Sequence, residues 1–153
     1  DSFSAERAAG HLSPISQRIF HVGPLGTGMV MKTINNSMVQ IYVSGLTELI
    51  PLAKKAGLPL KTALDILCTG PAGLPVVRDR IPKILGDDAT VGFTNSGTAK
   101  DNDVFRKILH HFDMRSPMLE GFDRQRTFSE KMGLAERDPA ELIRAAYDVS
   151  EAT

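Results

Sequence analysis

One lysine and two asparagines, Lys32, Asn35 and Asn36, stand in an apolar stretch that follows a glycine-rich turn, residues 23–28. Residues three and four apart share one side of a helix, so these side chains would face the same way. An ammonium can pass a proton to an alcohol oxygen, and an asparagine can donate and accept a hydrogen bond at once. Spacing alone leaves two interpretations open: a solvated lysine whose stem crosses apolar surface, or a lysine held in a site.

A phosphate-binding loop is one alternative, because a short β-favouring run at 18–22 precedes the glycines. The Walker A pattern requires Gly-Lys-Ser/Thr, whereas Gly28 is followed by Met29. A dinucleotide fingerprint beginning at Gly26 would place Met31 where close helix–strand packing requires a small residue. We therefore interpret the glycines as positions where another backbone segment approaches the first turn of the next helix.

The elements expected around these residues are helices. The pattern is helical from Leu25 to about Lys55 and apolar almost all round, which predicts a long, buried central helix that Pro51 kinks or ends. Shorter helices are expected at 60–67, 74–85, 99–112, 117–132 and 138–149, the last with Asp138 as its N-cap. No convincing strand follows Gly23. The sequence therefore predicts an all-α fold, a helical bundle around one long central helix.

The first residues have a different character. Residues 2–10 favour a helix that ends at Gly10, and residues 18–22 favour a strand, which has no partner strand in this sequence. We interpret residues 1–22 as the last helix and strand of an absent N-terminal domain, and residues 23–153 as an all-helical domain.

Composition narrows the function classes. The chain has 153 residues, 42% of them hydrophobic, and 18 basic residues balance 18 acidic ones, so no overall charge favours nucleic acid or an anionic membrane. Polar residues interrupt the longest apolar stretch, so it predicts no membrane span. Cys68 is the only cysteine, which favours a reducing compartment. Adjacent His110 and His111 would point to different sides of a helix, so no metal site is predicted. The basic residues at 124, 126, 131 and 137 are interpreted as a solvated face.

The pattern Gly23-x-x-Gly26-x-Gly28-x-x-x-Lys32-x-x-Asn35-Asn36 resembles the catalytic-lysine signature of the β-hydroxyacid dehydrogenases, relatives of 3-hydroxyisobutyrate dehydrogenase and tartronate semialdehyde reductase. The resemblance continues from Phe93 through Lys100-Asp101, and at Ser116-Pro117 and Asp138, so it covers residues 19–148. It implies the helical C-terminal domain of that family, which is similar to that of 6-phosphogluconate dehydrogenase, with a short remnant of a Rossmann domain at residues 1–22.

The resemblance also implies roles for four residues. Lys32 matches the catalytic lysine that carries the proton of the substrate hydroxyl, Asn36 matches the asparagine that orients the substrate, and Gly28 is assigned to the same substrate site. Lys100 matches a lysine that faces the cofactor. Gly97, Thr98 and Asn102 stand where the family usually carries apolar residues. The implied cofactor is NAD or NADP, bound mainly by the absent domain, so this chain alone should bind it weakly and be inactive.

The predicted function is therefore that of the C-terminal domain of an NAD(P)-dependent 3-hydroxyacid dehydrogenase, which interconverts a small 3-hydroxy acid and its semialdehyde or keto form. The expected partners are the hydroxy-carboxylate substrate and further copies of the chain in a homodimer or homotetramer, in the cytoplasm, with no nucleic acid and no membrane. One alternative is a non-catalytic helical dimerisation module. Another is a related imine or keto reductase, against which Lys32 argues, since such relatives tend to replace the lysine.

Overall fold

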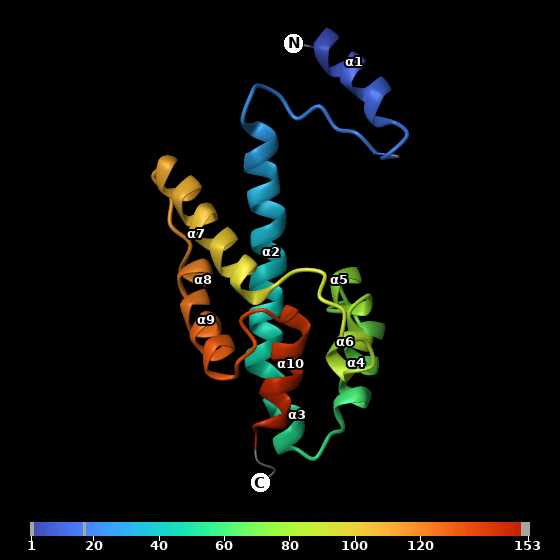
Figure 1. Cartoon of the computed structure of the whole chain (residues 1–153), viewed down its shortest axis with the longest axis vertical. Helices are drawn as coiled ribbons and strands as arrows, with labels where there is room; N and C mark the ends of the chain where they lie inside the picture. Colours follow the sequence, from blue (N-terminus) through green and yellow to red (C-terminus); the bar gives the residue numbers. More distant parts are fainter. Residues whose placement is uncertain (1, 17, 151–153) are drawn as a thin grey trace. The chain divides into compact units, whose positions relative to one another are not determined.

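Figure 1 shows the computed structural model of the chain, which describes residues 2–16 and 18–150, the side chains of 2–6 excepted. The chain divides into two units, one up to Asn35 and one from Asn36 on, and each is described by itself. Within the described residues, all regular elements are helices and no strand is formed. The predicted all-α fold is confirmed.

The first unit contains helix α1 (Ser2–Leu12), a connecting segment, and the first turns of α2 (Thr27–Leu49). Helix α1 continues past Gly10, where the sequence predicted its end. The predicted strand at 18–22 is wrong, because this segment has no regular secondary structure. A strand requires a neighbouring strand to bond its backbone, and the described residues supply none.

The glycine turn before α2 has a backbone that only glycine adopts easily. Gly23 has φ 116° and Gly26 has φ 99°, both in the region that an L side chain rarely occupies. A Cβ at Gly26 would meet open space within the described chain, and one at Gly28 would only touch the Val22 side chain at 4.0 Å. Gly23 and Gly26 therefore supply the turn itself, and no other segment of the described chain packs closely against Gly26 or Gly28.

The second unit contains the rest of α2 and eight further described helices. They are α3 (Pro51–Lys55), α4 (Leu60–Thr69), α5 (Pro75–Arg78), α6 (Ile81–Leu85), α7 (Asn95–His111), α8 (Pro117–Glu120), α9 (Phe122–Lys131) and α10 (Pro139–Asp148). The helix predicted to run to Lys55 is interrupted at Ile50, because Pro51 begins a new helix. Pro82 likewise divides the predicted helix 74–85 into α5 and α6, which ends at Gly86 with φ 85°.

Two groups of helices lie on either side of α2 within this unit (Figure 1): α4–α6 on one side and α7–α9 on the other. Side chains from α2 contact both. The hydroxyl of Tyr42 donates to the carbonyl of Ala72, and that of Ser44 donates to Oε1 of Gln125 on α9. From Asn36 on, α2 is therefore the central helix of the bundle, as the sequence predicted.

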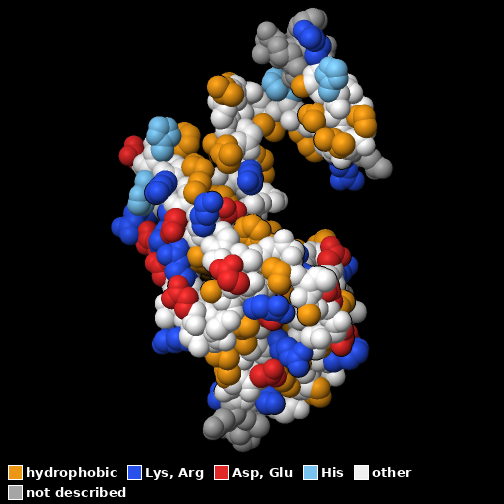
Figure 2. All heavy atoms as spheres, viewed as in Figure 1, with side chains coloured by type: hydrophobic (Ala, Val, Ile, Leu, Met, Phe, Trp, Pro, Cys, Tyr) orange, Lys and Arg blue, Asp and Glu red, His pale blue; other side chains and the backbone are white. Residues whose placement is uncertain are grey.

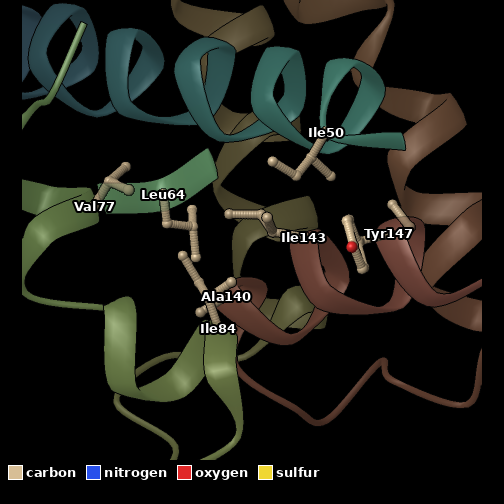
Figure 3. Close-up of a cluster of buried hydrophobic side chains, with 8 residues drawn as sticks. Ile50, Leu64, Val77, Ile84, Ala140, Ile143 and Tyr147 are labelled. Carbon is tan, nitrogen blue, oxygen red and sulfur yellow. The ribbon is translucent and has the colours of Figure 1, made fainter. Parts of the chain in front are cut away.

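The main apolar core lies where α10 packs against α3 and α6 (Figure 3). Leu64, Ile84 and Ile143 are completely or almost completely buried there, and Ile50 closes the cluster from the end of α2. The ring of Tyr147 completes it, with its hydroxyl donating to the Leu58 carbonyl at 3.0 Å. Burial of this set of apolar side chains holds α10 against the first half of the unit.

A buried carboxylate joins three segments of the same unit. Asp138 has no exposed surface and caps α10, with Oδ1 accepting from the Ala140 N–H at 3.1 Å. Its Oδ2 accepts from the Gly92 N–H at 3.2 Å, and Arg80 Nε lies 3.8 Å from Oδ1. The N-cap predicted at this position is confirmed.

The covered side of α2 carries polar residues as well as the apolar Tyr42, Val43 and Leu46, which pack against the core. Ser37, Gln40 and Thr47 are buried, whereas Met38 is 60% exposed and Leu49 69% exposed. The short helices of the unit cover only part of α2, and the covered part includes polar positions. The expectation of an apolar helix buried all round is therefore wrong for this unit.

Candidate functional site

The predicted site residues fall in both units. Gly28 and Lys32 lie in the first turns of α2, and the Lys32 side chain is exposed. Asn36 lies four residues after Lys32 in the same helix and is half-buried, within the second unit. Lys100 is exposed on the second turn of α7, also in the second unit. Within the second unit, the site thus has a polar amide on α2 and an ammonium on α7.

The glycine turn offers few donors to a phosphate. The Thr27 N–H and hydroxyl both donate to the Pro24 carbonyl, at 3.2 and 2.7 Å. The N–H groups of Met29 and Val30 donate to the Gly26 carbonyl, at 2.9 and 3.2 Å. A phosphate cradle needs such N–H groups directed at the ligand. Three N–H groups of this turn, those of Thr27, Met29 and Val30, are therefore engaged in hydrogen bonds within it.

The first N–H groups of α7 are also engaged in hydrogen bonds within the chain. Thr94 caps the helix by accepting from the Gly97 N–H at 2.9 Å. The N–H groups of Asn95 and Ser96 donate to carbonyls of the 134–137 loop, at 3.0 and 2.8 Å. The first N–H groups of a helix are the usual anion-binding groups, and here they are occupied. Near its start, α7 therefore offers an anionic ligand the exposed ammonium of Lys100.

The turn that carries Lys100 is held by side chains from α2 and α9, and by a side chain of α7 itself that bonds to α8. Gln40 Nε2 on α2 donates to the Thr98 carbonyl at 3.3 Å, and Arg126 Nη2 on α9 donates to the Ala99 carbonyl at 3.0 Å. Asn102, fully buried, donates from Nδ2 to the Leu119 carbonyl of α8 at 3.1 Å. Of positions 97, 98 and 102, Thr98 takes part in this bonding through its carbonyl and Asn102 through its side chain.

Sequence reasoning missed two of these contributors. Arg126 was placed on a solvated face, which is wrong, since it is half-buried and bonds α7. Gln40 is one of the polar residues that interrupt the longest apolar stretch, and the sequence pattern assigned it no role. Its position four residues after Asn36, on the same side of α2, was the available signal.

Ion pairs continue this contact along α7 and α9. Arg126 Nη2 lies 2.8 Å from Asp103 Oδ2, and Arg106 bridges Asp103 and Asp123 at 3.2 and 3.1 Å. The hydrogen bond from Arg126 lowers the pKa of Asp103 below its ordinary value, and the nearby positive charges add to this. Figure 2 shows acidic and basic side chains interspersed over this side of the unit. These pairs stabilise the antiparallel packing of α7 and α9.

The described residues were also compared with the requirements of a metal site and of a membrane span. No group of three His, Cys, Asp or Glu side chains among them is arranged to hold a metal ion. No described helix is both long and apolar enough to cross a membrane.

Comparison with known proteins identifies the family. A family model described as the NAD-binding domain of NADP-dependent 3-hydroxyisobutyrate dehydrogenase matches residues 26–146. An uncharacterised oxidoreductase of Synechocystis is 28% identical over 106 residues, 69% of this chain and 37% of that protein. An NAD-dependent L-serine dehydrogenase of Pseudomonas aeruginosa is 26% identical over 147 residues, 90% of this chain and 49% of that protein.

A solved structure has the same fold. The 3-hydroxyisobutyrate dehydrogenase of Mycobacterium tuberculosis, solved with L-serine, superposes with a TM-score of 0.80 at 22% identity, covering 95% of this chain and 52% of that one. The chain thus spans about half the length, or less, of the relatives it matches. The resemblance found in the sequence is confirmed: the chain belongs to the 3-hydroxyisobutyrate dehydrogenase family, within the β-hydroxyacid dehydrogenases.

Proposed function

We propose that this chain is the C-terminal, substrate-binding domain of an NAD(P)-dependent 3-hydroxyacid dehydrogenase, preceded in the full-length protein by a dinucleotide-binding domain. The observation that carries the proposal is the family match over residues 26–146, which includes Lys32 and Asn36 four residues apart in α2. The sequence before residue 23 would be the end of the preceding domain. The chain alone would lack most of the cofactor site and be inactive.

In this proposal Lys32 is the acid–base group. Its ammonium is exposed, so it is accessible to a ligand, and it would hold the substrate oxygen and take or return its proton as the carbonyl forms or is reduced. Asn36 would orient the same molecule, because its amide both donates and accepts. Gly28 would leave room beside the substrate, since only the Val22 side chain comes within 4.0 Å of its missing Cβ.

The described residues fit a nicotinamide cofactor in one respect. Lys100 is an exposed cation, and the neighbouring N–H groups at the start of α7 are occupied, so its ammonium is the group that would contact an anionic part of the cofactor. When bound, NAD or NADP supplies the hydride acceptor for the alcohol carbon. The remaining cofactor contacts would come from the preceding domain.

The proposed substrate class is a small carboxylate with an alcohol or aldehyde carbon. The names of two matched proteins, a serine dehydrogenase and a 3-hydroxyisobutyrate dehydrogenase, both fit this class. We also propose that the protein forms a homodimer or homotetramer and acts in the cytoplasm. Exposed methionines of α2, Met29 in one unit and Met38 in the other, support self-association, and the single Cys68 is compatible with a reducing compartment.

The test is steady-state kinetics on the full-length protein with L-serine and 3-hydroxyisobutyrate, each with NAD and with NADP. Lys32→Arg should lower kcat by about two to four powers of ten, since a guanidinium keeps the charge but does not give up its proton. Asn36→Ala should be milder and raise KM as well. Lys107→Arg, at an exposed lysine of α7, serves as the matched control and should keep activity within about twofold.

Two results would contradict the proposal. If Lys32→Arg stays within about threefold of the unmodified protein, Lys32 is not the proton carrier. If the unmodified protein oxidises neither alcohol with either cofactor, and reduces neither corresponding aldehyde, a non-catalytic dimerisation module becomes the better reading of the fold.

A further inference from the structure

One polar contact between α2 and α7 lies close to the proposed site residues on both helices. Gln40 lies four residues after Asn36, on the same side of α2, and its Nε2 donates to the Thr98 carbonyl two residues before Lys100. All four residues belong to the second unit. This hydrogen bond is therefore a direct link between the helical turn after Asn36 and the helical turn that carries Lys100.

The free-energy balance of this contact argues against a purely stabilising role. Gln40 is 7% exposed, and its Oε1 finds no hydrogen-bond partner in the part of the chain that the structure describes. The same is true of Oδ1 of the fully buried Asn102. A buried polar atom without a partner costs about 1–3 kcal/mol, which offsets the roughly 1 kcal/mol that one neutral hydrogen bond contributes. An apolar side chain of similar volume would hold the helices together without that cost.

What the amide provides, and an apolar side chain does not, is a defined distance and direction. Hydrogen bonds fix the donor and acceptor to within a few tenths of an ångström, whereas apolar contacts tolerate sliding. From the other side, Arg126 donates to the Ala99 carbonyl and to Asp103 at 3.0 and 2.8 Å. The turn before Lys100 is thus held between α2 and α9 by two side-chain donors on consecutive carbonyls.

We propose that Gln40 is a positioning residue, which sets the separation between the substrate-orienting Asn36 on α2 and the cofactor-facing Lys100 on α7. The inference rests on the proposed function of those two residues. Gln40 is buried, so in this proposal it is not assigned a direct contact with either ligand. It acts through the Thr98 carbonyl and therefore through the placement of Lys100.

The first test measures geometry and needs no activity. Spin labels on cysteines introduced at the exposed positions Met38 and Val104, in full-length protein whose other cysteines are replaced, report the distance between α2 and α7. Gln40→Met keeps the side-chain volume and removes the hydrogen bond. The distance distribution should broaden or shift by about 1 Å or more, the scale on which positioning matters for catalysis.

Gln125→Met is the matched control. Gln125 is 8% exposed and bonds α2 through Ser44, so its replacement removes a buried glutamine contact to the same helix at a different place. This variant should leave the label distance unchanged, whatever change in thermal stability either replacement causes. If both variants change the distance equally, or neither does, Gln40 has no special positioning role.

The second test is a double-mutant cycle in the enzyme assay, with KM for the cofactor measured at saturating substrate. Gln40→Met alone should raise this KM about three- to tenfold. In a Lys100→Met background it should have less than a twofold effect, because the group that it positions is absent. Equal effects in both backgrounds would overturn the inference even if the enzyme is active. An inactive unmodified protein would instead refute the proposed function, and the label distances would still decide the positioning role.

Discussion

Replacing Asp138 with alanine removes the carboxylate that joins α10, the Gly92 segment and Arg80. The lost N-cap of α10 is worth about 1 kcal/mol. The lost charge-assisted bond from Gly92, at 3.2 Å, is worth about 1.5–3 kcal/mol. Arg80 lies at 3.8 Å and is 35% exposed, so its pairing adds little. The sum is about 3 kcal/mol, which lowers Tm by roughly 10 °C for a domain of this size.

Urea unfolding of the chain, monitored by circular dichroism, measures the lost free energy of unfolding directly. Two further variants test the assignment of Asp138 more closely. Asp138→Asn keeps one acceptor and an effective N-cap, so it should cost about 1 kcal/mol. Ser116→Ala removes a cap from the short α8, where Oγ accepts only a 3.4 Å bond from Leu119, and should cost less than 1 kcal/mol. A loss below about 1 kcal/mol for Asp138→Ala would refute the assignment of Asp138 as a junction of three segments.

Two further predictions concern charge and assembly. Because the pKa of Asp103 is lowered in the folded chain, its pairing with Arg126 stabilises the fold above the unfolded pKa, and this stability is lost as pH falls through the lower, folded pKa. Asp103→Asn should therefore have a lower free energy of unfolding in urea than the unmodified chain at pH 7. The difference between the two should shrink below about pH 4. A difference that grows on acidification would contradict the lowered pKa of Asp103. Sedimentation of the full-length protein at micromolar concentration should give a dimer or tetramer, whereas a monomer at high micromolar concentration would contradict the proposed assembly.

Much of the fold was predictable because local signals agreed with it. Asp138 before Pro139, and Gly86 after α6, are typical helix boundaries, and both serve as such. The pattern of Lys32 and Asn36 was sufficient to indicate the family. The strand at 18–22 failed for a different reason, since β-favouring residues form a strand only where a neighbour pairs with them.

The polar contacts between helices could not be predicted from periodicity. Gln40 and Arg126 find acceptors 58 and 27 residues away in the chain, on the backbone of α7. Only the packed structure shows which carbonyls lie within their reach. Sequence patterns treat such residues as surface or as interruptions, because buried polar side chains are uncommon.

The hydrogen bonds made by Gln40 and Ser44 also restrict the rotation of α2 about its axis and its shift along that axis. A helix held by apolar contacts alone could rotate about its axis, or shift by a residue, and still bury a similar area. Each residue turns the helix by about 100°, so a one-residue shift would carry Gln40 away from Thr98 and Ser44 away from Gln125 at the same time. Alternative settings of α2 would thus bury several amide and hydroxyl groups without partners. The hydrogen bond from Gln40 disfavours those settings and helps α2 adopt a single orientation in the bundle.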